Sequence, residues 1–182
     1  MDILFRILLT LNATSLLILV FVAKEGIQLG SMFPSLIFLA EIPSWISYLA
    51  YMLIPVALTK IIILVSVFLP ERNFERGSII EIGHANNSFL PSYLGYFFVA
   101  LSIPDVDVLI FVYTLLFLFT YLSQALYFNP LFLVFGFQFY NIKTLNGAEL
   151  FLISKKSYKI PKEIGVSSCH SINDYTLMEG EK

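Results

Sequence analysis

The sequence predicts an α-helical integral membrane protein with four transmembrane helices and a small cytoplasmic subdomain that contains a β-hairpin. Composition is the first observation behind this fold class. Hydrophobic residues make up 58% of the 182 residues and charged residues 13%, and the mean hydropathy is +0.81. Soluble domains are roughly half apolar and a quarter charged. One soluble core in a chain of this length cannot bury so much apolar surface, so a lipid bilayer is the expected surrounding.

The second observation is the spacing of four apolar segments within residues 1–128. A helix that crosses the hydrocarbon core needs about 20 apolar residues. The predicted spans are residues 3–23, 45–69, 88–104 and 107–128. The third span is short and is expected to use its polar flanks to reach the interface. The first is interpreted as a retained helix rather than a signal peptide, because Asp2 offsets Arg6 and no small-residue cleavage site follows.

Lysine and arginine residues gather on one side of these spans, which predicts their orientation. Arg6 flanks the first span, and the loop 70–87 after the second span carries two arginines. More lysines follow the fourth span, and only Lys24 lies on the opposite side. We therefore expect a multi-pass protein of the inner membrane with both termini and the loop 70–87 in the cytoplasm.

The two connections on the external side are an apolar loop and a short turn with two aspartates. The loop 24–44 is rich in apolar residues but too short to span, so it is expected to form an interfacial helix, with a re-entrant segment as the alternative. Pro104 suits the first turn of the fourth helix. Asp105 and Asp107 lie where the helix dipole favours negative charge, so they are interpreted as a capped turn rather than a catalytic pair.

The third observation is a hairpin in the cytoplasmic tail, residues 129–182. Two segments rich in aromatic and β-branched residues flank Asn146-Gly147, which is a strong signal for a hairpin turn. A turn centred there pairs Ile142 with Phe151 and Tyr140 with Ile153. Residues 78–82 are expected to supply a third strand, because two strands alone are marginally stable.

The end of the tail, residues 165–182, is polar and acidic. It is expected to fray or to fold on a partner. Removal of residues 157–182 is accordingly expected to leave a folded, membrane-inserted protein that has lost its cytoplasmic partner.

Three polar side chains are predicted at one depth of the spans: Lys60, Asn12 and Thr120. They form an intramembrane polar layer that lines a path for ions or water in one interpretation. In the other, Lys60 snorkels toward the headgroups while Asn12 and Thr120 bond between helices.

Cations of the loop and tail form a predicted docking surface for a cytoplasmic protein. Its members are Arg72, Arg76, Lys155, Lys156, Lys159 and Lys162. The alternative role of the tail lysines is attraction to anionic lipid, worth about 1 kcal/mol each. The net charge of −2 and the acids near the end of the tail give no basic field for nucleic acid, so direct nucleic-acid binding is not expected.

Motifs that carry chemistry are missing from the sequence. It contains no nucleophile elbow and no phosphate-binding loop. His84, His170 and the single cysteine, Cys169, show no metal-ligand spacing. We therefore expect no catalytic, cofactor-binding or metal-binding residues, and a protein that is not an enzyme.

Two stretches resemble a known family. Residues 87–102 read Asn-Ser-Phe-Leu-Pro-Ser-Tyr-Leu-Gly-Tyr-Phe-Phe-Val-Ala-Leu-Ser, and residues 127–140 read Tyr-Phe-Asn-Pro-Leu-Phe-Leu-Val-Phe-Gly-Phe-Gln-Phe-Tyr. With the four spans, they resemble KwaA, the membrane component of the bacterial Kiwa anti-phage defence system. The resemblance implies a sensor of phage infection and a cytoplasmic DNA-binding effector, KwaB, as partner. It also implies a homo-oligomer, with a tetramer as the expected assembly.

The sequence is compatible with other functions. A small oligomeric membrane channel or transporter is the main alternative, since Pro55 and Lys60 interrupt the second span. An immunity or superinfection-exclusion protein is a third possibility. A neighbouring gene for a soluble DNA-binding protein would favour the defence sensor over the channel.

Overall fold

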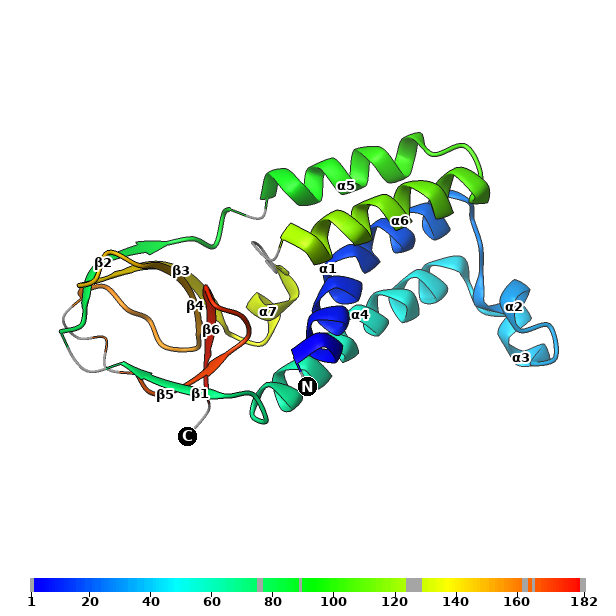
Figure 1. Ribbon diagram of the computed structural model, residues 1–182. Helices are drawn as coiled ribbons and strands as arrows, with labels where there is room; N and C mark the ends of the chain where they lie inside the picture. The colour runs from blue at the N-terminus through cyan, green and yellow to red at the C-terminus, as the bar shows by residue number, and fades with distance from the viewer. Residues whose placement is uncertain are drawn as a thin grey trace.

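The computed structural model describes residues 2–74, 77–88, 90–123, 129–161, 164 and 166–180. It consists of a helical region and a curled β-sheet that lie at opposite ends of an elongated molecule (Figure 1). Within the described residues, three helices are long and apolar enough to cross a membrane. They are α1 (Asp2–Lys24), α4 (Ser44–Ser66) and α6 (Val106–Ser123).

The predicted third span forms a shorter helix, α5 (Leu90–Ser102), of 13 residues. At 1.5 Å per residue it extends over about 20 Å, less than the hydrocarbon thickness of about 30 Å. Helix α1 is the centre of the helical region, since α4, α5 and α6 all pack against it. Their outward faces expose large apolar side chains, including Leu53, Phe98 and Phe111.

The connection between α1 and α4 lies at the end of the molecule away from the sheet (Figure 1) and contains two short helices, α2 (Leu29–Met32) and α3 (Ile37–Ala40). At the same end, the Oδ1 atom of Asp105 accepts a hydrogen bond of 2.9 Å from the backbone N–H of Val108. This contact caps α6 and confirms the capped-turn interpretation of Asp105. Pro104 lies just before the helix rather than in its first turn.

The sheet has six strands in the order β1-β5-β6-β4-β3-β2. The strands are β1 (Glu71–Phe74), β2 (Ile79–His84), β3 (Gln138–Thr144), β4 (Glu149–Ser154), β5 (Val166–Ser171) and β6 (Thr176–Glu179). Neighbouring strands are antiparallel except β4 and β6, which are parallel. The two edge strands, β1 and β2, follow each other directly in the chain, so the sheet curls into an open barrel (Figure 1).

The hairpin and its third strand are present, but the predicted register is wrong by one residue. Strand β2 pairs with β3, as expected for the third strand. Ile142 lies opposite Leu150, and Tyr140 lies opposite Leu152. The backbone N–H of Thr144 donates to the carbonyl of Ala148 at 2.9 Å and closes a three-residue loop, in which Gly147 has a φ of 78°. Such a loop needs one left-handed residue, whereas the predicted two-residue turn needs two.

The prediction for the end of the tail is also wrong. Residues 166–171 and 176–179 form β5 and β6, and β6 lies between β5 and β4 in the middle of the sheet. All four residues of β6 are buried, including Leu177 and Met178. Removal of residues 157–182 would therefore take away two strands of the barrel, so this truncation is not a clean test of partner docking.

Alternate residues of the strands face two different cores. The barrel core contains Ile79, Tyr140, Ile142, Leu152, Ile164, Cys169 and Leu177. The opposite face of β3, β4 and β6 carries Phe139, Phe151, Ile153 and Met178, which belong to a second cluster together with helix residues. Both faces of the central strands are thus buried, which explains why β4 reads as a continuous apolar run.

Candidate functional site at the junction of helices and sheet

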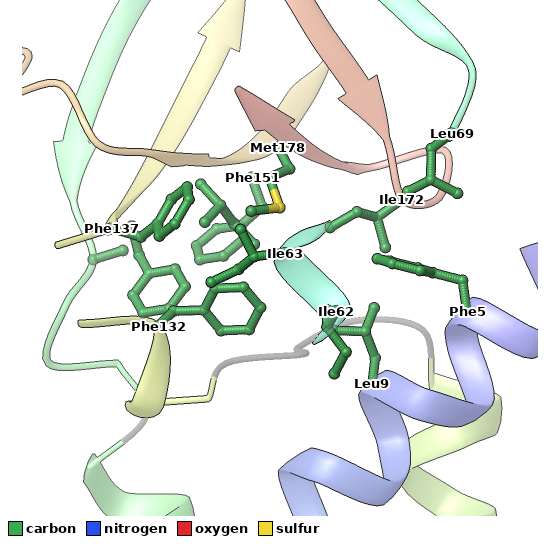
Figure 2. Close-up of a cluster of buried hydrophobic side chains, with 13 residues drawn as sticks. Phe5, Leu9, Ile62, Ile63, Leu69, Phe132, Phe137, Phe151, Ile172 and Met178 are labelled. Atoms are coloured by element: carbon green, nitrogen blue, oxygen red, sulfur yellow. The ribbon is translucent and has the colours of Figure 1, made fainter. Parts of the chain in front are cut away.

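One hydrophobic cluster, here called the junction core, joins the helical region to the barrel. Helices α1 and α4 contribute Phe5, Leu9, Ile62 and Ile63; α7 (Leu131–Val134) contributes Phe132; the sheet and its connections contribute Leu69, Ala85, Phe137, Phe139, Phe151, Ile153, Ile172 and Met178. Ile63 lies at the centre of this cluster, with Phe132 and Phe137 on one side and Phe5 on the other (Figure 2). Side chains from the beginning of α1 and the end of α4 therefore pack into one core with the sheet.

Aromatic rings give the junction core a defined geometry. The ring of Phe132 meets those of Phe137 and Phe139 edge to face, with centroids 6.0 Å and 6.3 Å apart. Phe139 then stacks on Phe151 across β3 and β4 at 5.7 Å. Edge-to-face and offset pairs of this kind add about 0.5–1.5 kcal/mol each beyond burial. The short helix α7 is thereby fixed against the sheet.

Backbone and polar contacts tie the helix ends to the same place. The backbone N–H of Ser171 in β5 donates to the carbonyl of Pro70 at 2.8 Å, and a ring nitrogen of the buried His170 lies 3.2 Å from the carbonyl of Leu69. Before α5, the Oδ1 atom of Asn86 accepts from the backbone N–H of Phe139 at 2.8 Å. The end of α4 and the segment that leads into α5 are thus both bonded to strands.

A polar layer surrounds the middle of α1, with members that differ from the predicted set. Asn12 is fully buried, and its Nδ2 donates to the Oγ1 of Thr59 at 2.7 Å. Thr14 donates to the hydroxyl of Tyr113 at 3.2 Å. The hydroxyl of Tyr93 lies 3.5 Å from the carbonyl of Ala13. The Oδ1 atom of Asn12 has no hydrogen-bond partner among the described residues.

The structure does not bring the three predicted members of the polar layer together. Lys60 is exposed, and its Nζ lies 5.7 Å from the centroid of the Phe135 ring, next to the junction core. Thr120 is half-buried, and its carbonyl accepts from Ser123 at 3.2 Å. Asn12 pairs with Thr59 instead. A role of these residues in ion passage stays a prediction.

The sequence reasoning missed Thr14, Thr59, Tyr93 and Tyr113. The predicted layer contained only Lys60, Asn12 and Thr120, which were matched by depth in the spans. The positions of Tyr113 in the middle of α6 and of Thr59 in α4 were the available signal, since hydroxyls there must bond to another helix or to their own backbone. Thr59 does both, because its hydroxyl also donates to the carbonyl of Pro55 at 2.8 Å.

Two cations fix the ends of α1. A guanidinium nitrogen of Arg6 lies 3.3 Å from the carbonyl of Tyr121 near the end of α6, and the guanidinium carbon lies 5.0 Å from the centroid of that ring. At the other end, the ammonium of Lys24 donates to the carbonyl of Ile103, just after α5. Both contacts place positive charge at a helix C-terminus, where the macrodipole favours it.

The predicted docking cations divide into different environments. The Nζ of Lys156 lies 2.6 Å from the Oε1 of Glu179, which is 7% exposed. Ser154 also donates to this carboxylate, and the hydroxyl of Tyr158 does so at 3.1 Å. Lys156 thus pairs from the surface with a buried carboxylate of the barrel. Lys155 lies with its Nζ 5.1 Å from the centroid of the Phe137 ring.

The network around Glu179 shifts two neighbouring groups. Burial, followed by the Glu179 charge, raises the pKa of the Tyr158 hydroxyl above its ordinary value. The same two causes raise the pKa of the Cys169 thiol to about 12. Both groups therefore stay protonated at neutral pH.

Two grooves lie on the barrel surface. One has a volume of about 550 Å³ and is lined by Arg72, Asp174 and Tyr175 among others. The second, of about 750 Å³, is lined by Lys159, Glu81 and again Tyr175. Tyr175 is 65% exposed and borders both grooves. Arg76 and Lys162 lie outside the described residues.

Among the residues that the structure describes, no group of three or more His, Cys, Asp and Glu side chains is arranged to hold a metal ion.

The molecule is a helical protein with apolar outer faces, joined to a β-barrel through a shared core. The chain belongs to the family described as anti-phage protein KwaA, which it matches over residues 5–178. It is accordingly a protein of anti-phage defence. Searches of curated proteins and of solved structures give no match.

Proposed function

We propose that this protein is a membrane-embedded sensor and scaffold of a bacterial anti-phage system, without enzymatic activity, that recruits a cytoplasmic DNA-binding effector of the KwaB type. The observation that carries the proposal is the junction core. In it, buried residues of two long apolar helices and of a polar-surfaced barrel form one packed cluster. A change in the helices would therefore be transmitted to the barrel, because close-packed interiors respond to small shifts.

The outer surface of the helices supports placement in the inner membrane. None of the residues of α6 is buried, and Phe111 and Phe119 are 65% and 62% exposed. Contiguous apolar surface of this kind marks a membrane or protein interface. In the proposal α5 is the fourth span, with its short length accommodated by local thinning of the bilayer or by neighbouring copies in a homo-oligomer, for which a tetramer is expected.

The position of the lysines supports the proposed orientation. The start of α1 and the ends of α4 and α6 all lie at the barrel end (Figure 1), where the barrel and its lysines also are. By the positive-inside rule, this distribution supports a cytoplasmic position for the barrel and both termini. The barrel is accordingly the surface available to a cytoplasmic effector.

Arg72, Lys159 and Tyr175 are the proposed centre of effector docking. The two cations line separate grooves, and the exposed Tyr175 borders both. Aromatic residues of this kind commonly carry binding energy, whereas charges at the rim set the association rate and its salt dependence. Lys156 is left out of this surface, because its ammonium already neutralises the buried Glu179.

The test is co-purification of the soluble effector with the full-length protein from detergent. Arg72→Glu with Lys159→Glu, and separately Tyr175→Ala, should abolish co-purification and phage protection while the protein stays in the membrane fraction. Glu41→Lys, an exposed change in the connection at the opposite end, is the matched control and should behave as wild type. Equal effector yield from the barrel variants would refute docking at these grooves.

The channel alternative has one observation in its favour, the buried polar layer around Asn12. The layer's hydroxyls and amide, however, bond between helices of the same chain, as in Asn12 to Thr59 and Thr14 to Tyr113. This arrangement is typical of helix association rather than of a pore lining. Ion flux through vesicles that contain the protein, lost in Asn12→Leu, would favour the channel over the sensor.

A further inference from the structure

Lys60 is the only charged residue of α4. Lys60 lies on α4, six residues before the helix ends at Ser66, which is about 9 Å along the axis. The helix contains no acidic residue, and among the described residues Lys60 takes part in no ion pair. Its ammonium instead lies over the Phe135 ring, toward the barrel end of the helix. The ring occupies one side of the ammonium. The N–H groups on its other side need oxygen acceptors.

A second cation reaches the same short segment from the sheet. Lys155 directly follows β4, and its Nζ lies 5.1 Å from the centroid of Phe137. Phe135 and Phe137 are two residues apart, between α7 and β3, so the ammonium groups of Lys60 and Lys155 each lie over a ring of the same short segment.

Apolar side chains are exposed on the helix beside these cations. Ile61 and Leu64 on α4 are 47% and 58% exposed, and Val134 at the end of α7 is 69% exposed. Helices α4 and α7 pack against each other, and Phe135 directly follows α7, so these exposed side chains lie on elements next to the segment that holds Phe135. A ligand that satisfies both features has an anionic head beside long apolar chains.

We infer that Lys60 and Lys155 bind the phosphate group of an anionic phospholipid of the cytoplasmic leaflet, with its acyl chains along the exposed face of α4. The inference rests on the membrane placement and orientation in the proposed function. The phosphodiester oxygens supply the acceptors that the Lys60 ammonium lacks within the described residues. Basic pockets at the cytoplasmic ends of helices are the kind of site that binds anionic headgroups. The occupied site would hold α4, α7 and the start of β3 together at the junction core.

The experiment uses the full-length protein purified in detergent, to which phosphatidylglycerol, phosphatidylcholine or inorganic phosphate is added. Thermal stabilisation and bound lipid, counted by native mass spectrometry, are the two readouts. Wild-type protein should bind phosphatidylglycerol in preference to phosphatidylcholine. Lys60→Gln and Lys155→Gln should each weaken phosphatidylglycerol binding about fivefold, the expected effect of one lysine at an anionic surface.

Lys143→Gln is the matched control, since Lys143 lies on β3 in the barrel with its Nζ 3.9 Å from Glu149. It should bind phosphatidylglycerol as wild type does. Equal phosphatidylglycerol binding by the Lys60→Gln, Lys155→Gln double variant would overturn the site. Stabilisation by inorganic phosphate as strong as that by the lipid would overturn the lipid assignment. Release of wild-type protein from membranes by alkaline carbonate would instead refute the membrane placement, which separates the two failures.

Discussion

In the helical region, hydrogen-bonding side chains lie inside around α1 beside apolar ones such as Leu17, and apolar side chains also cover the outside, whereas the barrel has an apolar interior and charged residues on its surface. Asn12, Thr14 and Thr59 are each at most 1% exposed, while Phe111 on α6 is 65% exposed. In the barrel, Leu152 and Leu177 are fully buried and charged residues such as Glu149 lie on the surface. The buried carboxylate of Glu179 in the barrel has three side-chain donors.

The contrast shows that the two regions are stabilised by different forces. Burial of apolar surface stabilises a barrel in water. Helices with apolar outer faces gain little from it if their surroundings are lipid, and they associate through packing and interhelical hydrogen bonds. Substitutions of similar chemistry should therefore have large effects in the barrel and small ones among the helices.

The largest expected effect comes from Leu177→Asp in β6. Leu177 is fully buried in the barrel core, so the substitution places an unpaired carboxylate in an apolar interior. The expected loss is about 4 kcal/mol or more, enough to unfold the barrel. Limited proteolysis should show a digested barrel, while the helices remain in the membrane fraction. Leu145→Asp, at a position 66% exposed on the hairpin loop, should stay resistant. Resistance of the Leu177 variant would contradict the central place of β6.

The next effect tests whether the two regions are coupled. Phe132→Ala removes a fully buried ring from the junction core, which should cost about 3–5 kcal/mol. We expect the barrel and the helices to unfold in one transition in the wild type and in two separate transitions in this variant. Val134→Ala, on the same short helix but 69% exposed, is the control and should retain one transition. One transition in the Phe132 variant would mean that the ring is not needed for coupling.

Part of this organisation could be predicted from the sequence. Apolar segments of membrane length mark α1, α4 and α6, because periodicity matters little where both faces are apolar. Asn146-Gly147 marks the hairpin, since a glycine with φ of 78° is required there. The register was not predictable from face alternation, because Phe151, Leu152 and Ile153 are all buried and either register buries apolar side chains.

The rest depends on contacts that are distant in the sequence. Strand β5 has the sequence Val-Ser-Ser-Cys-His-Ser, which reads as polar, and it becomes a strand by pairing with β1 and β6. Strand propensity depends on such neighbours. The polar layer was predicted at Asn12, and its bond to another helix agrees with one of the two interpretations, but the sequence did not identify Thr59 as the partner. The rotation of α4 about its axis decides which of the adjacent residues Thr59 and Lys60 faces Asn12. The apolar pattern of this helix does not determine that rotation.

An intermediate effect is expected from alkaline pH, and only in the barrel. The pKa of Cys169 is raised from 9.0 to about 12, and that of Tyr158 is also raised. Both groups are neutral below these values, so their contribution to stability is complete below pH 9 and is lost as pH rises toward 12. Chemical denaturation of the barrel should show this decline, and Cys169→Ala should make it shallower. A flat stability between pH 9 and pH 11 would argue that the thiol and the hydroxyl are not buried.

The smallest effect is expected where the buried groups are polar, at Asn12. Its Nδ2 donates to Thr59, but its Oδ1 has no partner among the described residues, so the net gain from this amide is small. Interhelical hydrogen bonds in membrane proteins average about 0.6 kcal/mol in double-mutant cycles. Asn12→Leu keeps the approximate volume and removes the unpaired acceptor, so it should change the free energy of unfolding by less than about 1 kcal/mol.

Thr59→Val provides the second variant of a cycle with Asn12→Leu, measured by thermal unfolding in detergent. The coupling energy between the two changes should be about 0.6 kcal/mol. A coupling above about 2 kcal/mol, or loss of folding in Asn12→Leu, would show that the polar layer holds the helices as strongly as apolar burial holds the barrel. The contrast between the two regions would then fail. A small coupling, together with the large effect at Leu177, means that the helices rely on apolar surroundings that only a bilayer or further copies of the chain provide.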